Sequence, residues 1–171
     1  MKEQLTLEWI APYLPYGLKV SCFFKDNNGE LSFEREGVII GIKTETNPDR
    51  GHPIKVKTRS HPESRFYSEL AYIWDEIKPH LRPLSQLTEE IEYNGERFTP
   101  TERLFDDDSP LIGADFTPTK QAHNFIERYK EGLCYPLEFW QQLYKYHFDI
   151  NGLIEKGLAI EIPSLKEEVK E

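Results

Sequence analysis

The sequence lacks the features that define several large classes of protein. Only two of its 171 residues are cysteines, Cys22 and Cys134, and they lie far apart. A disulfide framework needs more and closer cysteines, so we expect a reducing compartment, with both thiols behaving as small buried hydrophobes. No run approaches 18 apolar residues, and the short amphipathic start after Met1 predicts neither a signal peptide nor a membrane span.

Motifs that bind metals or phosphates are also missing. Zinc sites use pairs such as Cys-x-x-Cys or two histidines four apart on a helix, and the sequence has neither. His52 and His61 could converge with Asp49 or Glu63 across a loop. Each of these histidines precedes a proline, however, which is more typical of an exposed turn residue. No glycine-rich phosphate loop occurs, and we expect no cofactor.

No residue set indicates a reaction. Neither cysteine has a nearby histidine, and paired carboxylates are too common in this chain to single out an acid and a base. The triplet 106–108 is Asp-Asp-Asp but lacks the alternating ligands and the glycine of a calcium loop, so we interpret 105–116 as a solvated acidic linker. We therefore expect no enzyme. A metal-dependent hydrolase built on the loop histidines is the remote alternative.

Positive charge is scarce but concentrated. The chain has 21 Lys and Arg against 30 Asp and Glu, a net charge of -9. Residues 50–82 nevertheless carry seven basic and four acidic side chains, whereas 83–116 carry two basic and nine acidic ones. The overall charge opposes generic adhesion to nucleic acid or to an anionic membrane, so any binding to a polyanion must be local.

Short alternating runs between residues 17 and 84 predict a small β-barrel. Thr6 can cap a short helix that Pro12 and Pro15 prevent from continuing, and Gly17 allows the chain to turn. The strand patterns that follow are 18–22, 31–33, 37–42, 54–59, and 70–73 continued by Ile77 and Leu81. Gly41 indicates either a bulge or a close backbone approach. No gap between them is long enough for a crossover helix, which favours an open barrel of the SH3-like kind.

The second half of the chain predicts a hairpin and helices. Asn94-Gly95 marks a tight turn within 90–98, and helical spacing follows Pro118 and Pro136. In the second of these helices Leu137, Trp140, Tyr144 and His147 share one face. The predicted fold is thus α+β, with a lead-in helix and barrel at 1–86, a hairpin and acidic linker at 87–118, and a subdomain of two to three helices, a last short strand at 158–162 and a charged tail at 119–171.

One strand carries the candidate surface. Lys55, Lys57 and Arg59 alternate with Ile54, Val56 and Thr58, so the three cations share one strand face. Neighbouring segments add four residues to this candidate surface: Arg65, Tyr67, Lys78 and Arg82. Cations with interleaved aromatics can follow a phosphate backbone and stack bases. The alternative is cross-strand pairing of these cations with Glu34, Glu36 and Glu45. We favour this alternative because the net negative charge of the protein repels polyanions.

Two blocks carry a family resemblance. Residues 5–19 with 77–84, and residues 146–160, resemble small uncharacterised proteins encoded by phages and prophages of gut bacteria. The resemblance implies no activity, but it implies a mobile-element protein in the cytosol of a bacterial host. We expect a non-enzymatic interaction module that binds a host or phage protein through the barrel or the linker. The alternative is a nucleic-acid-binding accessory protein that uses the basic strand face.

Overall fold

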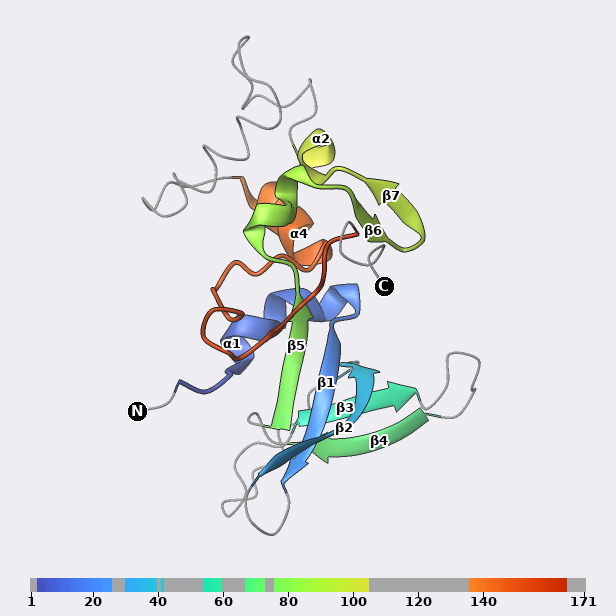
Figure 1. The fold of residues 1–171 in the computed structure, drawn as a ribbon. Helices are drawn as coiled ribbons and strands as arrows, with labels where there is room; N and C mark the ends of the chain where they lie inside the picture. The colour runs from blue at the N-terminus through green and yellow to red at the C-terminus, as the bar shows by residue number, and fades with distance from the viewer. Residues whose placement is uncertain are drawn as a thin grey trace. The chain divides into compact units, whose positions relative to one another are not determined.

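The computed structural model describes residues 3–25, 30–39, 41, 54–59, 67–72, 76–104 and 136–165 (Figure 1). Within these residues the protein is a mixed α+β fold with a curled half-barrel sheet and few helices. Its elements, in chain order, are α1 (Leu7–Ile10), η1 (Ala11–Tyr16), β1 (Lys19–Lys25), β2 (Leu31–Val38), β3 (Ile54–Arg59), β4 (Tyr67–Tyr72), β5 (Ile77–Leu81), η3 (Leu84–Thr88), β6 (Ile91–Tyr93), β7 (Glu96–Phe98), α2 (Pro100–Leu104), α4 (Leu137–Lys145) and β8 (Ile160–Glu161).

The chain forms two compact units that are not consecutive in sequence. The first contains Met1–Leu81 and Asn151–Glu161, and the second contains Arg82–Ile150 and Ile162–Glu171. This grouping differs from three successive regions at 1–86, 87–118 and 119–171. The difference arises because the last strand returns to the first unit, where β8 pairs in parallel with β5.

The first unit is a six-stranded sheet with the order β4-β3-β2-β1-β5-β8. Neighbouring strands are antiparallel except for the last pair. Strands β3 and β4 run across the direction of β1 and β5, as expected of a strongly twisted and curled sheet (Figure 1). The sequence patterns predicted a strand in each of these regions, but the runs 31–33 and 37–42 are replaced by the single strand β2, which ends at Val38, and β4 begins at Tyr67 and not at residue 70.

The lead-in helix ends as predicted. Thr6 occupies the cap position with extended backbone but makes no side-chain cap hydrogen bond. Helix α1 passes into the 3-10 turn η1, which contains Pro15. Gly17 then adopts φ +71° and donates its N–H to the Leu14 carbonyl at 3.4 Å, a left-handed conformation that favours glycine.

A bulge interrupts the pairing of β1 with β2. Cys22 lies opposite Arg35, whereas the next residue, Phe23, lies opposite Phe33, so Glu34 is the extra residue in β2. Neither alternative predicted for Gly41 is observed among the described residues: β2 ends before it at Val38, and a Cβ at Gly41 would meet no atom within 4 Å.

The two faces of this sheet differ in burial. We call one the outward face; its described side chains are Lys19, Ser21, Phe23, Leu31, Phe33, Glu36, Val38, Lys78 and His80. The opposite core face carries Val20, Cys22 and Ile77, which are 0–2% exposed. The predicted burial of Cys22 is therefore confirmed.

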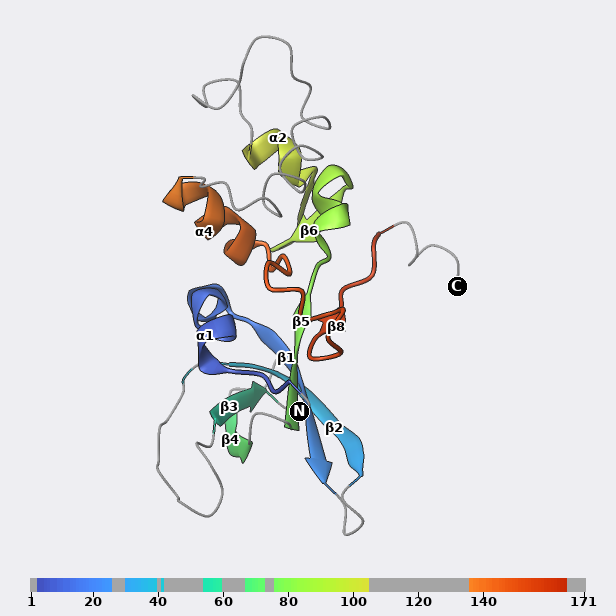
Figure 2. The ribbon, with the colours of Figure 1, turned by 90° about the vertical axis from the view of Figure 1, so that its left-hand side faces the viewer.

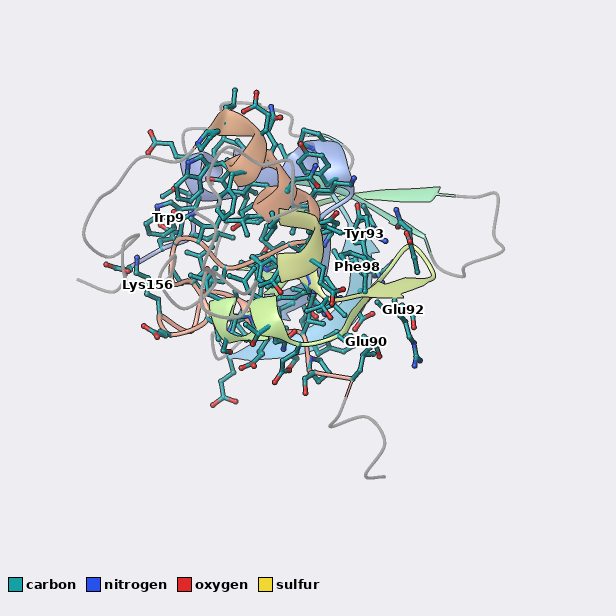
Figure 3. The ribbon with its side chains drawn as sticks, turned by 90° about the horizontal axis from the view of Figure 1, so that it is seen from above. Trp9, Glu90, Glu92, Tyr93, Phe98 and Lys156 are labelled. Carbon is teal, nitrogen blue, oxygen red and sulfur yellow. The ribbon has the colours of Figure 1, made fainter. Side chains whose placement is uncertain are left out.

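The core of the first unit also draws on the two chain ends. Its buried residues come from α1 and η1 as well as from the returning segment, which contributes Leu153 and Ala159. Lys156 Nζ lies 4.7 Å from the ring centre of Trp9 and 3.4 Å from a carboxylate oxygen of Glu3 (Figure 3). These contacts join the segment 151–161 to the first residues of the chain.

The second unit contains the predicted hairpin. Asn94 and Gly95 have φ values of +54° and +80°, as the tight turn between β6 and β7 requires, so this prediction is confirmed. Tyr93 and Phe98 of this hairpin pack against Tyr146, with ring centres 5.4 and 5.0 Å away (Figure 3). Arg103 lies 3.6 Å above the Phe98 ring and forms an ion pair with Glu96.

The buried residues of helix α4 lie outside the face predicted from Leu137, Trp140, Tyr144 and His147. Phe139 and Leu143 are buried, whereas Leu137 is 66% exposed. The helix ends at Lys145, and His147 lies beyond it with φ +61°. The chain turns there because the backbone of residues 147–149 pairs with Arg82 through two 2.7 Å hydrogen bonds.

Several predicted features fall outside the described residues: the linker 105–116, the helix after Pro118 and the burial of Cys134. No helix in the described ranges is long and apolar enough to cross a membrane.

Candidate interaction surface

The strand register places the predicted basic residues on the outward face. Val38, which is on this face, pairs with Lys57 of β3. Residues directly opposite one another on paired strands lie on the same face, and alternate residues of one strand share it. The positions of Lys55, Lys57 and Arg59 therefore lie on the outward face, together with Tyr67, which pairs with Arg59.

Other predicted members of this surface have different environments. Lys78 is half-buried on the outward face, directly opposite Ser21. Arg82 is only 9% exposed, and it donates from Nη2 to the Glu92 carbonyl at 2.8 Å and from Nη1 towards Gln86 Oε1 at 3.5 Å. The Arg82 guanidinium is thus used inside the second unit. Arg65 lies outside the described residues.

Carboxylates interrupt the cationic positions. Glu36 is exposed on the outward face and lies opposite Ser21, and the register places Glu69 opposite Lys57. Of the carboxylates expected from sequence, Glu34 is the bulge residue and Glu45 lies outside the described residues. Glu69 is the partner position that sequence reasoning missed, because it depends on the register of β3 with β4.

A serine and a histidine meet at the centre of the outward face. Ser21 Oγ and His80 Nε2 are 2.8 Å apart, and Ser21 is 3% exposed. Burial lowers the pKa of His80, with Glu36 opposing the shift and Lys19 adding to it. At neutral pH His80 therefore adds no positive charge to this face. The buried hydroxyl ties β1 to β5 and gives a substrate little access.

Exposed apolar side chains gather where β1 and β2 extend past β5. We call Phe23, Phe24, Leu31 and Phe33 the ribbon tip; its three most exposed members, Phe33, Phe24 and Leu31, are 59%, 47% and 43% exposed. Phe23 and Phe33 lie edge to face with ring centres 6.1 Å apart. Among the described residues, strand β5 pairs with β1 only as far as Cys22, and both ribbon views show the β1–β2 hairpin continuing beyond β5 (Figures 1 and 2).

The ribbon tip was not identified from sequence, although a signal was present. Phe23 and Phe24 are adjacent, so a strand places one aromatic ring on each side. A strand buried on one face needs only the alternate residues to be apolar. Two adjacent aromatic residues therefore depart from the alternation of a strand that is buried on one face and solvated on the other.

Among the described side chains, no three His, Cys, Asp or Glu residues gather closely enough to hold a metal ion. His52 and His61 lie outside the described residues. No family model, curated protein or solved structure matches the chain.

Proposed function

We propose that this protein is a non-enzymatic interaction module that binds a host or phage protein in the cytosol of a bacterial host. The observation that supports this proposal is the ribbon tip. Three of the five large hydrophobic side chains that are exposed among the described residues, Phe24, Leu31 and Phe33, belong to it. A cluster of exposed apolar side chains on one projecting element is typical of a protein-binding site.

The energetics suit a small binding site. Burying a Phe or Leu side chain fully gains about 1.5 to 3 kcal/mol. Aromatic anchors at the centre of an interface commonly dominate its binding energy. A strand pair also loses little backbone conformational entropy on binding, because the hydrogen bonds between its strands already fix the backbone.

The proposed scaffold is a small SH3-like open barrel, followed by a hairpin and a helical subdomain. The curled sheet and its mainly antiparallel order support this assignment. The resemblance of both chain ends to phage and prophage proteins supports the proposed setting. Under this proposal the barrel holds the ribbon tip rigid and performs no reaction.

Partner capture from the lysate of a bacterial host tests the proposal. Phe33→Ser removes the most exposed aromatic of the tip, and Leu7→Ser is the matched control because Leu7 is 39% exposed on α1. We expect a protein, identified by mass spectrometry, that the wild type and Leu7→Ser retain and Phe33→Ser loses. If every captured protein is retained equally by Phe33→Ser, the ribbon tip is not the binding site.

A second candidate function is nucleic-acid binding. The observation that favours it is that the positions of Lys55, Lys57 and Arg59 share the outward face with the Phe23–Phe33 pair. Cations and exposed rings together bind single strands. The test is salt-dependent binding to a short DNA or RNA, lost when the three cations become Glu. Absence of binding at about 50 mM salt would exclude this candidate.

A further inference from the structure

We propose that the ribbon tip and the neighbouring cations bind an acidic protein segment, in which carboxylates flank bulky apolar side chains. This inference rests on the proposed function and adds the chemistry of the partner. The proposed binding surface has two components: the apolar ribbon tip at one end of the outward face, and the cationic positions on the remaining part of that face.

The apolar component is the outward side of the tip. Phe23, Leu31 and Phe33 lie on the same side of the ribbon, because Phe23 pairs with Phe33 and residue 25 pairs with Leu31. The edge-to-face packing of Phe23 on Phe33 leaves Phe33 59% exposed. This arrangement offers a bulky apolar side chain an aromatic and an aliphatic surface at once.

The charged component begins on the same strand. Lys19 is exposed on the outward face, and the half-buried Lys78 lies opposite Ser21 on β5. The register adds three cationic positions on β3 and one anionic position, Glu69, on β4. With Lys25, which pairs with Leu31, six cationic positions therefore share the outward face with two carboxylate positions, Glu36 and Glu69, on a chain whose net charge is -9.

The two components are within reach of one short segment. Phe23 and Lys19 are four residues apart on β1, a separation of about 13 Å at 3.3 Å per strand residue. An extended peptide of about five residues spans that distance. One continuous segment of the partner can therefore place an apolar side chain against Phe33 and a carboxylate near Lys19.

A peptide fits these side chains better than a nucleic acid does. Leu31 is aliphatic and Phe24 lies on the other side of the ribbon, so neither serves a stack of bases along the outward face. Glu36 lies among the cations, and neutral His80 adds no charge. The net charge of -9 also repels a strand with one charge per phosphate more than a peptide with a few carboxylates.

Selection from a random peptide library displayed on filamentous phage tests the inference. The full chain is immobilised and compared with Phe33→Ser, Lys19→Glu and two controls, Leu7→Ser and Arg97→Glu. Arg97 is an exposed cation on β7 in the second unit, so its reversal matches the charge change of Lys19→Glu. Circular dichroism verifies that each variant is folded.

We expect the wild type and both controls to enrich sequences that combine Asp or Glu with Leu, Ile or Phe. Phe33→Ser is expected to abolish the enrichment, and Lys19→Glu to remove its acidic component. A labelled peptide from the selection should bind several-fold more weakly as salt rises, because the attraction is partly between exposed charges.

Enrichment of neutral or basic sequences overturns the inference, and so does an unchanged result with Lys19→Glu. If Phe33→Ser still loses the lysate partner in that case, the proposed function stands and only the acidic chemistry fails. Binding of an oligothymidylate of about 12 nucleotides that Lys19→Glu abolishes would also overturn it, in favour of the nucleic-acid candidate.

Discussion

The side chains at the centre of the outward face show how the sheet accommodates polar groups. Ser21 is almost fully buried, and its hydroxyl lies 2.8 Å from His80 Nε2 on the neighbouring strand. A buried polar group without a hydrogen bond costs free energy, so the pair is stabilising only while His80 can keep this bond and avoid an unfavourable charge.

Stability should fall as the His80 ring becomes charged. Its pKa is lowered mainly by burial, despite Glu36, so the unfolded chain takes up this proton at a higher pH than the folded chain. Around and below the ordinary histidine pKa of about 6.5 the unfolded state binds more protons, so the free energy of unfolding decreases as the pH falls below about 7. Urea unfolding should show this decrease to be smaller in His80→Gln. Equal decreases in both proteins would contradict the assignment.

A second prediction concerns the core face. Leu18 is 0% exposed, so Leu18→Ala should lower the free energy of unfolding by about 2 to 5 kcal/mol through lost burial and the cavity left behind. Leu7 is 39% exposed, and Leu7→Ala should change stability by no more than about 0.5 kcal/mol. Urea denaturation of the two variants measures the contrast. Similar decreases in the free energy of unfolding for both variants would contradict the burial of Leu18.

Among the elements, the β1–β2 ribbon and the β6–β7 hairpin illustrate two ways to shape a strand pair. The bulge at Glu34 keeps Phe33 opposite Phe23 and so decides which side of the ribbon carries the aromatic pair. In the second hairpin the turn residues set the register, because Asn94 and Gly95 both adopt positive φ.

Gly95 provides a clean test of turn geometry. A Cβ at Gly95 would meet no atom within 4 Å, but its φ of +80° strains any other residue, so Gly95→Ala should cost about 1 to 2 kcal/mol. A Cβ at Gly41 also meets nothing, and this residue has no positive φ. Gly41→Ala should be neutral or slightly stabilising. Equal melting temperatures of the Gly95→Ala and Gly41→Ala variants would contradict the positive φ of Gly95.

At the scale of the whole molecule, the sheet unit is built from both ends of the chain. Residues 151–161 return to it, β8 pairs with β5, and Leu153 is 0% exposed. The stability of the sheet should therefore depend on residues far from it in sequence. The pairing of β8 with β5 costs conformational entropy, because it closes a long loop of the chain.

Leu153→Ala should destabilise the first unit by about 2 to 5 kcal/mol. Hydrogen exchange followed by mass spectrometry should show lower protection in β1 and β5 than in the wild type. Leu137→Ala is the control, because Leu137 is 66% exposed on α4. Unchanged protection of β1 and β5 in Leu153→Ala would mean that the returning segment contributes little to the sheet.

Local patterns predicted much of the secondary structure. The end of α1 follows from the prolines and Gly17, the β6–β7 turn from Asn94-Gly95, and the start of α4 from Pro136. These features depend on backbone preferences of a few adjacent residues, which sequence alone contains. The shared face of Lys55, Lys57 and Arg59 follows equally from the two-residue period of a strand.

Contacts between distant residues were decided only by the tertiary structure. The parallel pairing of β8, the burial of Arg82 and the position of Glu69 opposite Lys57 depend on strand register across long separations. The exposure of the ribbon tip likewise depends on the described part of β5, which pairs with β1 as far as Cys22 while β1 continues to Lys25. A sequence pattern indicates which residues can share the face of one strand. The packing of the whole unit determines which strand pairs with it and where that neighbouring strand ends.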